Sequence, residues 1–227
     1  MKKEEVRARI EETGIVAAIR VSRSDDAYYA AETVYNAGIP VAEITMTVPG
    51  AIDVITDLAT KHPDMIVGAG TVLDQETARR CLDAGAKFLT SPGLVLEVVD
   101  FALKNEVVVF PGVLTATEVI MAWKAGVDFI KIFPCAQVGG DRYIRALKVP
   151  FPKVPLIASG GVNQLTAANF ILAGATALGI GSELIPKEAL MRRQEAWIGE
   201  LARRFTGIVR DARAQLRAGQ AGRLTPP

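Results

Sequence analysis

Four segments of the chain repeat one pattern of polar and apolar positions. Each begins with a residue that often caps a helix, continues as an Ala-rich amphipathic stretch, and ends in Ala-Gly before a short apolar run. The glycines at these ends stand 47, 41 and 48 residues apart. Each segment is therefore predicted to be a helix that ends at a left-handed glycine and is followed by a β-strand. The segments are Ser24 to Gly38 with IPVAEITM, Asp74 to Gly85 with AKFLTSP, Thr115 to Gly126 with VDFIKIF, and Asn163 to Gly174 with ATALGIG.

The gaps between these repeats leave room for a second strand each, because one strand and one helix take about half of the spacing. Apolar runs stand at the expected places, as IVAAI at 15–19, MIVGAG at 65–70, VVVFPG at 107–112 and PLIASGG at 155–161. Short apolar strands that alternate with helices are typical of a parallel sheet covered on both faces. Eight such units in a chain of this length predict an α/β fold, a closed (β/α)8 TIM barrel.

The two ends of the chain are predicted to add helices to the barrel. Residues 1–13, with KKEEVRARIEE, predict an extra N-terminal helix, and residues 186–227 predict C-terminal helices and a tail. The segment from about Pro186 to Leu216 has apolar positions at helical spacing and is predicted to form two helical pieces. The last ten residues, AGQAGRLTPP, are predicted to fray. Since no linker composition interrupts the chain, residues 1–227 are predicted to form a single domain.

Composition and charge narrow the possible functions. Hydrophobic residues make up 50% of the chain and the net charge is +1, so a large core is expected and neither nucleic acid nor an anionic membrane is the expected partner. No apolar run reaches the ~18 residues that span a bilayer, and no apolar signal segment follows the basic start, so a cytoplasmic location is expected.

Few residues are suited to metal or triad chemistry. Cys81 and Cys135 stand in no ligand spacing, and the one histidine, His62 in KHPD, is expected to be a surface turn residue. These counts exclude histidine-based triads and zinc sites that contain histidine. Catalysis is therefore expected to use lysine, carboxylate, hydroxyl or backbone groups, with no cofactor and no metal.

Polar residues inside two predicted strands carry the candidate chemistry, because function in this fold belongs to the carboxyl ends of the strands. Lys131, in FIKIF, is expected to be buried, where an ammonium needs a partner or loses its proton and becomes a nucleophile for carbonyls. In AEITMT, Glu43, Thr45 and Thr47 share the face that is predicted to point into the barrel. Glu43 is expected to be the counter-charge of Lys131 and a general acid/base. A purely structural ion pair is the alternative for both residues.

Anion-binding groups are predicted at the same end of the barrel. Arg20 ends the first strand, where it could bind an anion, act on the protonation of Lys131 or serve the structure. Glycine-rich turns without Lys or Arg follow strands seven and eight, so backbone N–H groups would bind a phosphate there. This position matches the recurrent phosphate site of the fold. The predicted phosphate ligands are Ser159, Gly160, Gly161, Gly181 and Ser182.

Six short motifs occur in a fixed order: AEITMT at 42–47, GAGTVLD at 68–74, SPG at 91–93, FPGV at 110–113, FIKIFP at 129–134 and SGGV at 159–162. Together they resemble the 2-keto-3-deoxy-6-phosphogluconate (KDPG) aldolase family, which also acts on 4-hydroxy-2-oxoglutarate. The resemblance covers roughly residues 14–190. It implies a homotrimeric class I aldolase that cleaves 2-dehydro-3-deoxy-6-phosphogluconate, a phosphorylated keto acid, to pyruvate and glyceraldehyde 3-phosphate.

The resemblance also implies roles for single residues. Lys131 would form the Schiff base and Glu43 would act as acid/base, while Thr71, Pro92 and Phe133 would form the pyruvate pocket. The two glycine turns would hold the phosphate.

Three positions depart from the family pattern. Thr47 stands where some members have an arginine that grips the substrate carboxylate, so Arg20, Thr71 and backbone N–H groups are expected to bind that carboxylate here. Ala158-Ser159 stands where Pro-Thr often precedes Gly-Gly, and Gln137 stands where glutamate is common. These three positions affect which substrate the protein is expected to prefer. Gluconate-derived, galactonate-derived and hydroxyoxoglutarate substrates are all compatible with the sequence.

Two other functions fit the same pattern. Sugar-phosphate isomerases and epimerases use this barrel and these phosphate turns, and they also pair lysine with carboxylate. A non-catalytic protein that binds sugar phosphates would need only the two glycine turns and not the lysine or the carboxylate. Trapping with borohydride separates the aldolase from both, because only an iminium mechanism leaves a reduced adduct on Lys131.

Overall fold

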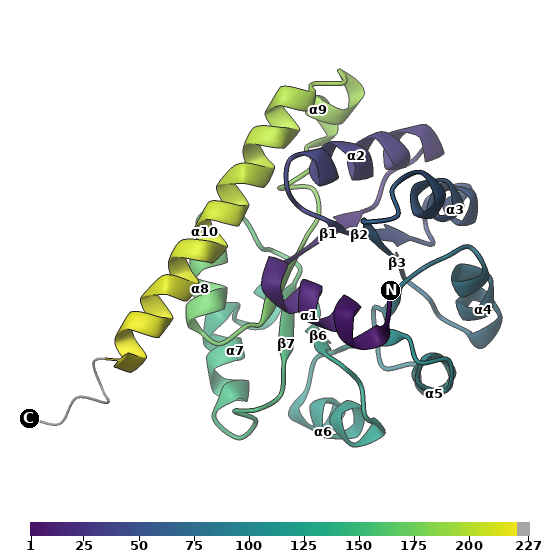
Figure 1. The fold of residues 1–227 in the computed structure, drawn as a ribbon. Helices are drawn as coiled ribbons and strands as arrows, with labels where there is room; N and C mark the ends of the chain where they lie inside the picture. Colours follow the sequence, from purple (N-terminus) through teal and green to yellow (C-terminus); the bar gives the residue numbers. More distant parts are fainter. Residues whose placement is uncertain (222–227) are drawn as a thin grey trace, which may run out of the picture.

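The computed structural model describes residues 1–221 as a closed barrel of eight parallel strands, β1 to β8, in sequence order (Figure 1). Every strand pairs with the next in parallel, and β8 pairs with β1 to close the ring. The predicted (β/α)8 barrel is confirmed. The strands are β1 (Ile15–Ile19), β2 (Val41–Thr45), β3 (Ile66–Gly70), β4 (Phe88–Ser91), β5 (Val108–Val113), β6 (Ile130–Ile132), β7 (Leu156–Ser159) and β8 (Ala177–Ile180).

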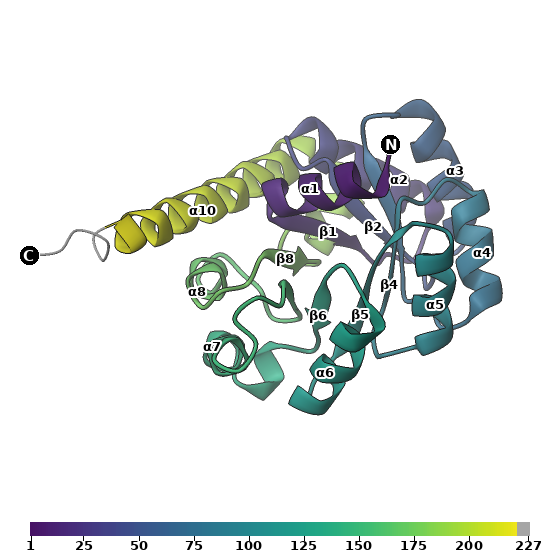
Figure 2. The same ribbon diagram turned by 60° about the horizontal axis from the view of Figure 1, so that its bottom comes forward.

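Helices surround the barrel on its outside, one between each pair of consecutive strands (Figures 1 and 2). A 3-10 helix at Ala136–Val138 precedes α7. The surrounding helices are α2 (Ser24–Asn36), α3 (Ala51–Lys61), α4 (Gln75–Asp83), α5 (Leu96–Lys104), α6 (Ala116–Ala125), α7 (Asp141–Lys148) and α8 (Ala167–Leu172).

The four predicted helix starts differ in how they are capped. Asp74 and Thr115 each accept a hydrogen bond from the backbone N–H three residues on, as predicted. Ser24 is already the first residue of α2 and makes no cap bond. The side chain of Asn163 accepts from two backbone N–H groups of a turn that precedes α8, because the chain turns once before this helix begins. Each predicted helix-end glycine has a positive φ, namely Gly38, Gly85, Gly126 and Gly174.

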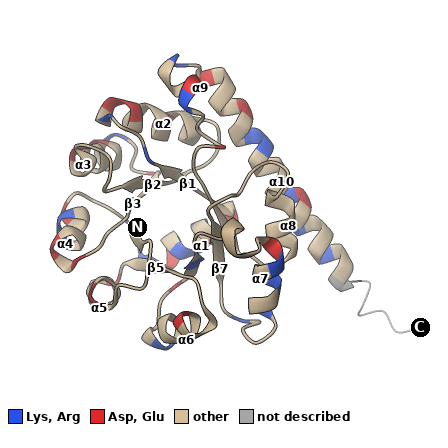
Figure 3. Cartoon of the chain, turned by 180° about the vertical axis from the view of Figure 1, so that it is seen from behind, with Lys and Arg blue, Asp and Glu red and all other residues tan. Residues whose placement is uncertain are grey.

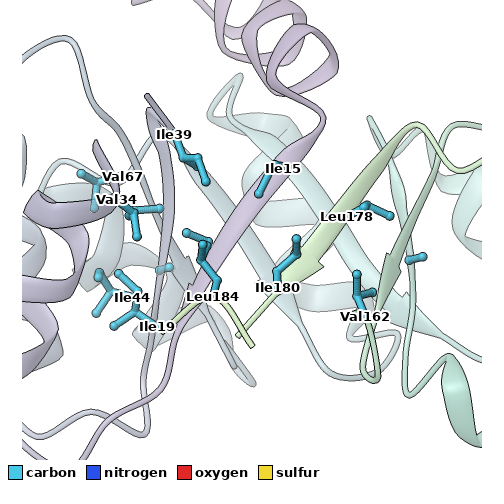
Figure 4. Close-up of a cluster of buried hydrophobic side chains, with 14 of the residues drawn as sticks. Ile15, Ile19, Val34, Ile39, Ile44, Val67, Val162, Leu178, Ile180 and Leu184 are labelled. Atoms are coloured by element: carbon cyan, nitrogen blue, oxygen red, sulfur yellow. The ribbon is translucent and has the colours of Figure 1, made fainter. Parts of the chain in front are cut away.

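Alternation along each strand produces two separate cores. Outward-facing residues such as Ile15, Ile44 and Leu178 pack beneath the surrounding helices (Figure 4). Inward-facing residues form a second cluster inside the barrel, near the end where the strands begin. Val6 and Ile10 of α1 (Lys3–Thr13) complete this inner cluster, whose other members are Val16, Val41, Ile66, Phe88, Val108, Phe110, Phe129, Ile157 and Ala177.

Helix α1 closes that end of the barrel and crosses its centre (Figure 1). Asp128, which is buried just before β6, accepts hydrogen bonds from Lys3 Nζ and from the backbone N–H of Val109, both at 3.0 Å. The predicted N-terminal helix is thus confirmed. Because one end is closed by apolar packing, only the carboxyl ends of the strands are left to form a site.

Two helices follow β8, as predicted: α9 (Lys187–Met191) and α10 (Glu195–Ala221). Helix α10 packs along α8 and α2 and extends beyond the barrel (Figures 1 and 2). The helix continues to Ala221, so the prediction that the chain frays from residue 218 is wrong for residues 218–221, and residues 222–227 lie outside the described part. Within residues 1–221, no helix combines the length and apolar character needed to cross a membrane.

We expect Arg213→Ala to destabilise the fold by about 1–3 kcal/mol, because Arg213 joins α10 to the closed end of the barrel. Its guanidinium donates to the backbone carbonyls of Glu11, Glu12 and Thr176 at 2.6–2.8 Å, and these acceptors would lose their partner. Thermal or urea unfolding measures the change. Arg210→Ala is the matched control, since Arg210 pairs only with its neighbour Asp211 on the exposed side of the same helix. Equal stability of the two variants would contradict the role of Arg213.

Candidate active site

A polar layer lies inside the barrel, above the apolar cluster that α1 closes. It arises from the same alternation, because every second residue of a strand faces inward. Two of its hydroxyls are satisfied by backbone: Thr45 donates to the Ile19 carbonyl at 3.2 Å, and Thr90 donates to the Phe110 carbonyl at 2.7 Å. The other buried inward-facing polar side chains are Glu43, Lys131 and Ser159.

Lys131 of β6 and Glu43 of β2 meet across the barrel. The distance from Lys131 Nζ to each carboxylate oxygen of Glu43 is 3.5 Å, and the two residues are only 7% and 2% exposed. This distance is at the outer limit of a hydrogen bond, so the amine is held beside the carboxylate without a tight bond. Lys131 Nζ also lies 5.6 Å from the centre of the Phe133 ring. The predicted burial of Lys131 and the predicted inward orientation of Glu43 agree with this contact.

Gly70, at the end of β3, makes room for the carboxylate of Glu43. A Cβ atom at this position would overlap the carboxyl group of Glu43. Sequence analysis did not single out this residue, although a signal was present. Gly68 and Gly70 alternate in MIVGAG on the inward face that Ile66 begins, which indicates a strand that leaves space inside the barrel.

A cavity of about 940 Å³ opens at the carboxyl ends of the strands. Thr47 in its wall contacts the Thr45 hydroxyl at 2.8 Å, and Arg20 is exposed to it. Ser159, which is buried, lines this cavity, whereas Lys131 and Glu43 do not line it. The structure brings most of the predicted ligands to this one cavity: Arg20, Thr47, Phe133, Ser159, Gly160, Gly161, Gly181 and Ser182.

Gly161 shows why the turn after β7 needs glycine. Its φ of +81° is unfavourable for other residues, and a Cβ atom there would overlap the Cβ of Ala136. The backbone of this turn therefore packs closely against the 3-10 helix. Gly160 and Gly161 line the cavity, and neither has a side chain that would keep a ligand from their backbone.

Two predicted substrate ligands, Thr71 and Pro92, do not line this cavity. They follow β3 and β4 at the same end of the barrel. Thr71 has a φ of +59°, which strains a β-branched residue by about 1–3 kcal/mol. Such strain persists only where the surrounding structure imposes it, and it is common at functional sites.

Sequence analysis missed the part of the cavity wall that comes from the chain after β8. Lys187, Leu190 and Met191 of α9 line the cavity, together with Arg23 and Asp26 from the start of α2. From the sequence, the C-terminal segment was predicted only to form two helical pieces and a tail. Its path over the cavity depends on tertiary packing, so no local sequence signal could have indicated it.

The histidine and the cysteines serve the structure away from the site. His62 is half-buried rather than a surface turn residue, because its Nε2 contacts the Tyr28 hydroxyl at 3.3 Å and Glu32 at 3.1 Å between α2 and α3. Cys81 and Cys135 are buried and free, and burial raises the pKa of each thiol to about 12. Among residues 1–221, no group of three or more His, Cys, Asp or Glu side chains is placed to hold a metal ion.

Comparisons with known proteins agree with this geometry. The 2-dehydro-3-deoxy-phosphogluconate aldolase of Pseudomonas aeruginosa is 31% identical over 192 residues, which cover 85% of this chain and 87% of that protein. The KHG/KDPG aldolase of Escherichia coli K12 is 30% identical over 189 residues, covering 83% and 89%.

Solved structures give the same picture. The KDPG aldolase of Legionella pneumophila, with pyruvate captured at low pH as a covalent carbinolamine intermediate, has a TM-score of 0.80 and 30% identity, covering 87% of this chain and 96% of that one. A cube-shaped protein cage designed by fusing symmetric oligomeric domains has a TM-score of 0.84 and 29% identity, covering 93% and 77%. A family model described as KDPG and KHG aldolase matches residues 6–201, so this chain belongs to the KDPG and KHG aldolase family.

Proposed function

We propose that this lyase is a class I aldolase that cleaves 2-dehydro-3-deoxy-6-phosphogluconate to pyruvate and glyceraldehyde 3-phosphate through a Schiff base on Lys131. The observation that carries the proposal is the buried contact between Lys131 and Glu43 inside the barrel, whose strands β7 and β8 are followed by the two glycine turns. A Legionella relative that holds pyruvate as a carbinolamine supports it, since a carbinolamine is the adduct of an amine with a ketone.

The first step is the attack of the Lys131 amine on the C2 ketone of the substrate. The amine must be neutral to attack, and the carboxylate of Glu43, 3.5 Å away, is placed to accept its proton. Addition gives the carbinolamine, and loss of its hydroxyl as water gives an iminium. The surrounding side chains exclude other water, because both residues are almost completely buried.

The second step breaks the C3–C4 bond. The iminium accepts the electron pair of this bond, while Glu43, through one water, takes the proton of the C4 hydroxyl. Glyceraldehyde 3-phosphate leaves and an enamine remains on Lys131. Glu43 then returns a proton to C3, and water hydrolyses the resulting iminium to release pyruvate. The same carboxylate thus acts as base and acid in turn.

Substrate binding is divided between the two halves of the site. We propose that the carboxylate of the pyruvate half binds to Arg20 and to the strained turn at Thr71, with Pro92, Phe133 and Thr47 beside it. The Thr47 hydroxyl is already engaged with Thr45 at 2.8 Å, so Arg20 is the stronger ligand for a charged group. The phosphate of the other half binds to the turns after β7 and β8.

Pyruvate release together with borohydride trapping tests the function. The protein should release pyruvate from the phosphorylated keto acid, and borohydride should reduce a pyruvate adduct onto Lys131, which peptide mass spectrometry locates. A sugar-phosphate isomerase or epimerase would produce neither result, and a binder would bind phosphates without releasing pyruvate. Comparing kcat/KM for gluconate-derived, galactonate-derived and hydroxyoxoglutarate substrates then identifies the preferred one.

We expect Gly181→Ala to weaken use of the phosphorylated substrate about tenfold. The added Cβ would meet only the Ala18 carbonyl at 3.4 Å, so the fold should tolerate it, but its methyl group would occupy the cavity wall where the phosphate approaches. The kcat/KM for 2-dehydro-3-deoxygluconate, which lacks the phosphate, should change much less. An equal loss on both substrates in a folded variant would mean that this turn does not hold the phosphate.

We also propose a homotrimer. Helices α4, α5 and α6 are neighbours around the barrel (Figure 1). Exposed apolar side chains occur just before α4 (Leu73), at the start of α5 (Leu96) and on α6 (Ile120 and Met121). A relative of this chain forms part of a cage built from symmetric oligomeric domains, which supports an oligomer. Light scattering in solution should give a mass of three chains of 24.3 kDa.

A further inference from the structure

Helix α9 supplies a cation to the cavity that contains the glycine turns. Lys187 begins α9 and lies in the same cavity wall as Gly161, Gly181 and Ser182. The turns themselves contain no Lys or Arg. The cation therefore reaches the site from a segment that lies after the eighth strand, beside α2 (Figure 3).

The ion pairs of the cavity wall leave Lys187 available. Arg23 pairs with Asp25 at 2.9 Å, and Asp26 pairs with Arg193 at 2.9 Å, so both are already neutralised. In the described part of the chain, Lys187, Arg20 and the remaining carboxylate of the wall, Glu183, take part in no ion pair. The exposed ammonium of Lys187, in the same cavity wall as the two glycine turns, is suited to a dianion.

Arg193 fixes the position of α9. It stands two residues after the last residue of α9, Met191, and has a φ of +51°. Its guanidinium contacts Asp25 at 3.3 Å and Asp26 at 2.9 Å, and lies 4.5 Å from the centre of the Tyr29 ring. These contacts tie the end of α9 to α2, so the start of α9 is held over the cavity.

We propose that Lys187 binds the phosphate of the substrate, as a cation that completes the two backbone turns, and that Arg193 is the positioning residue that holds it there. The proposal rests on the proposed aldolase function and deepens it. Lys187 thereby determines the preference for a phosphorylated over an unphosphorylated substrate, while the reaction at Lys131 does not depend on it.

The test is Lys187→Met, which keeps the length of the side chain and removes its charge. We expect kcat/KM for 2-dehydro-3-deoxy-6-phosphogluconate to fall about tenfold, mainly through KM, because the lost contact is a charge-assisted one at an exposed position. The kcat/KM for 2-dehydro-3-deoxygluconate, the same chain without phosphate, should stay within about twofold. Lys153→Met, exposed in the segment before β7 at the opposite end of the barrel, is the matched control and should change neither value. An unchanged preference in Lys187→Met would overturn the proposal.

A binding measurement separates this proposal from the aldolase function. Inorganic phosphate should raise the unfolding temperature of the wild-type protein, and Lys187→Met should need a several-fold higher phosphate concentration for the same rise. Borohydride trapping of pyruvate should be the same in both. Loss of trapping in the wild type would reject the aldolase function alone, whereas identical phosphate responses would reject the role of Lys187 alone.

The role of Arg193 is tested by a double-mutant cycle. Arg193→Ala should raise KM for the phosphorylated substrate and leave kcat unchanged. In the Lys187→Met background the same substitution should cause no further rise, because the cation that it positions is already absent. Additive effects of the two substitutions would overturn the positioning role.

Discussion

Lys131→Ala and Lys131→Arg should both abolish cleavage, with kcat falling more than about 10⁴-fold. Alanine removes the amine that forms the Schiff base. Arginine keeps the positive charge beside Glu43, but a guanidinium does not form the iminium. The two variants together therefore separate the covalent role of Lys131 from its charge. Pyruvate release under single-turnover conditions, and borohydride trapping followed by peptide mass spectrometry, measure the result.

Stability must be measured alongside activity, because Lys131 is one half of a buried pair. Removing one partner of such a pair typically costs about 3–5 kcal/mol, since the other charge stays buried without compensation. Lys131→Ala would leave the Glu43 carboxylate in that state, 2% exposed. Lys131→Met combined with Glu43→Gln removes both charges and serves as a folded, inactive reference. Residual activity within tenfold of wild type in either single variant would reject the Schiff-base assignment.

The barrel could be predicted because its signals are local. Each Ala-Gly helix end and each apolar run is formed by residues that are close together in the sequence. Both can therefore be recognised without knowing any long-range contact. Alternation along AEITMT likewise placed Glu43 on the inward face before any contact was known. Glu43 was also the expected counter-charge of Lys131, 88 residues away, because a lysine buried in a strand needs a partner and Glu43 was the carboxylate predicted to face inward.

Features that depend on the path of the chain between elements could not be predicted. Lys187 lines the cavity on a helix whose end contacts α2 through Arg193 and Asp25, residues that stand 168 positions apart. The half-buried state of His62 depends on the packing of α2 against α3. Helix α10 continues to Ala221 and so includes AGQA, the first four residues of the tail that was predicted to fray.

Glu43→Gln should lower kcat about 10²–10⁴-fold, which is the usual contribution of a positioned general acid/base. Glutamine has nearly the shape of glutamate, so it should fit the space that Gly70 leaves and keep the barrel packed. It cannot take the proton of the C4 hydroxyl or return a proton to C3. The rate of cleavage should therefore fall more than the rate of adduct formation.

Comparing the loss of adduct formation with the loss of cleavage shows whether Glu43 acts in catalysis or only supports the structure. Borohydride trapping of pyruvate on Lys131 needs only formation of the iminium, and it should survive in part in Glu43→Gln. Glu43→Asp is the matched variant: it keeps a carboxylate but retracts it by one methylene from an amine that is already 3.5 Å away, so its kcat should lie between those of the wild type and Glu43→Gln. If Glu43→Gln folds normally and keeps the wild-type kcat, Glu43 is only the structural partner of Lys131, and another group must carry the proton.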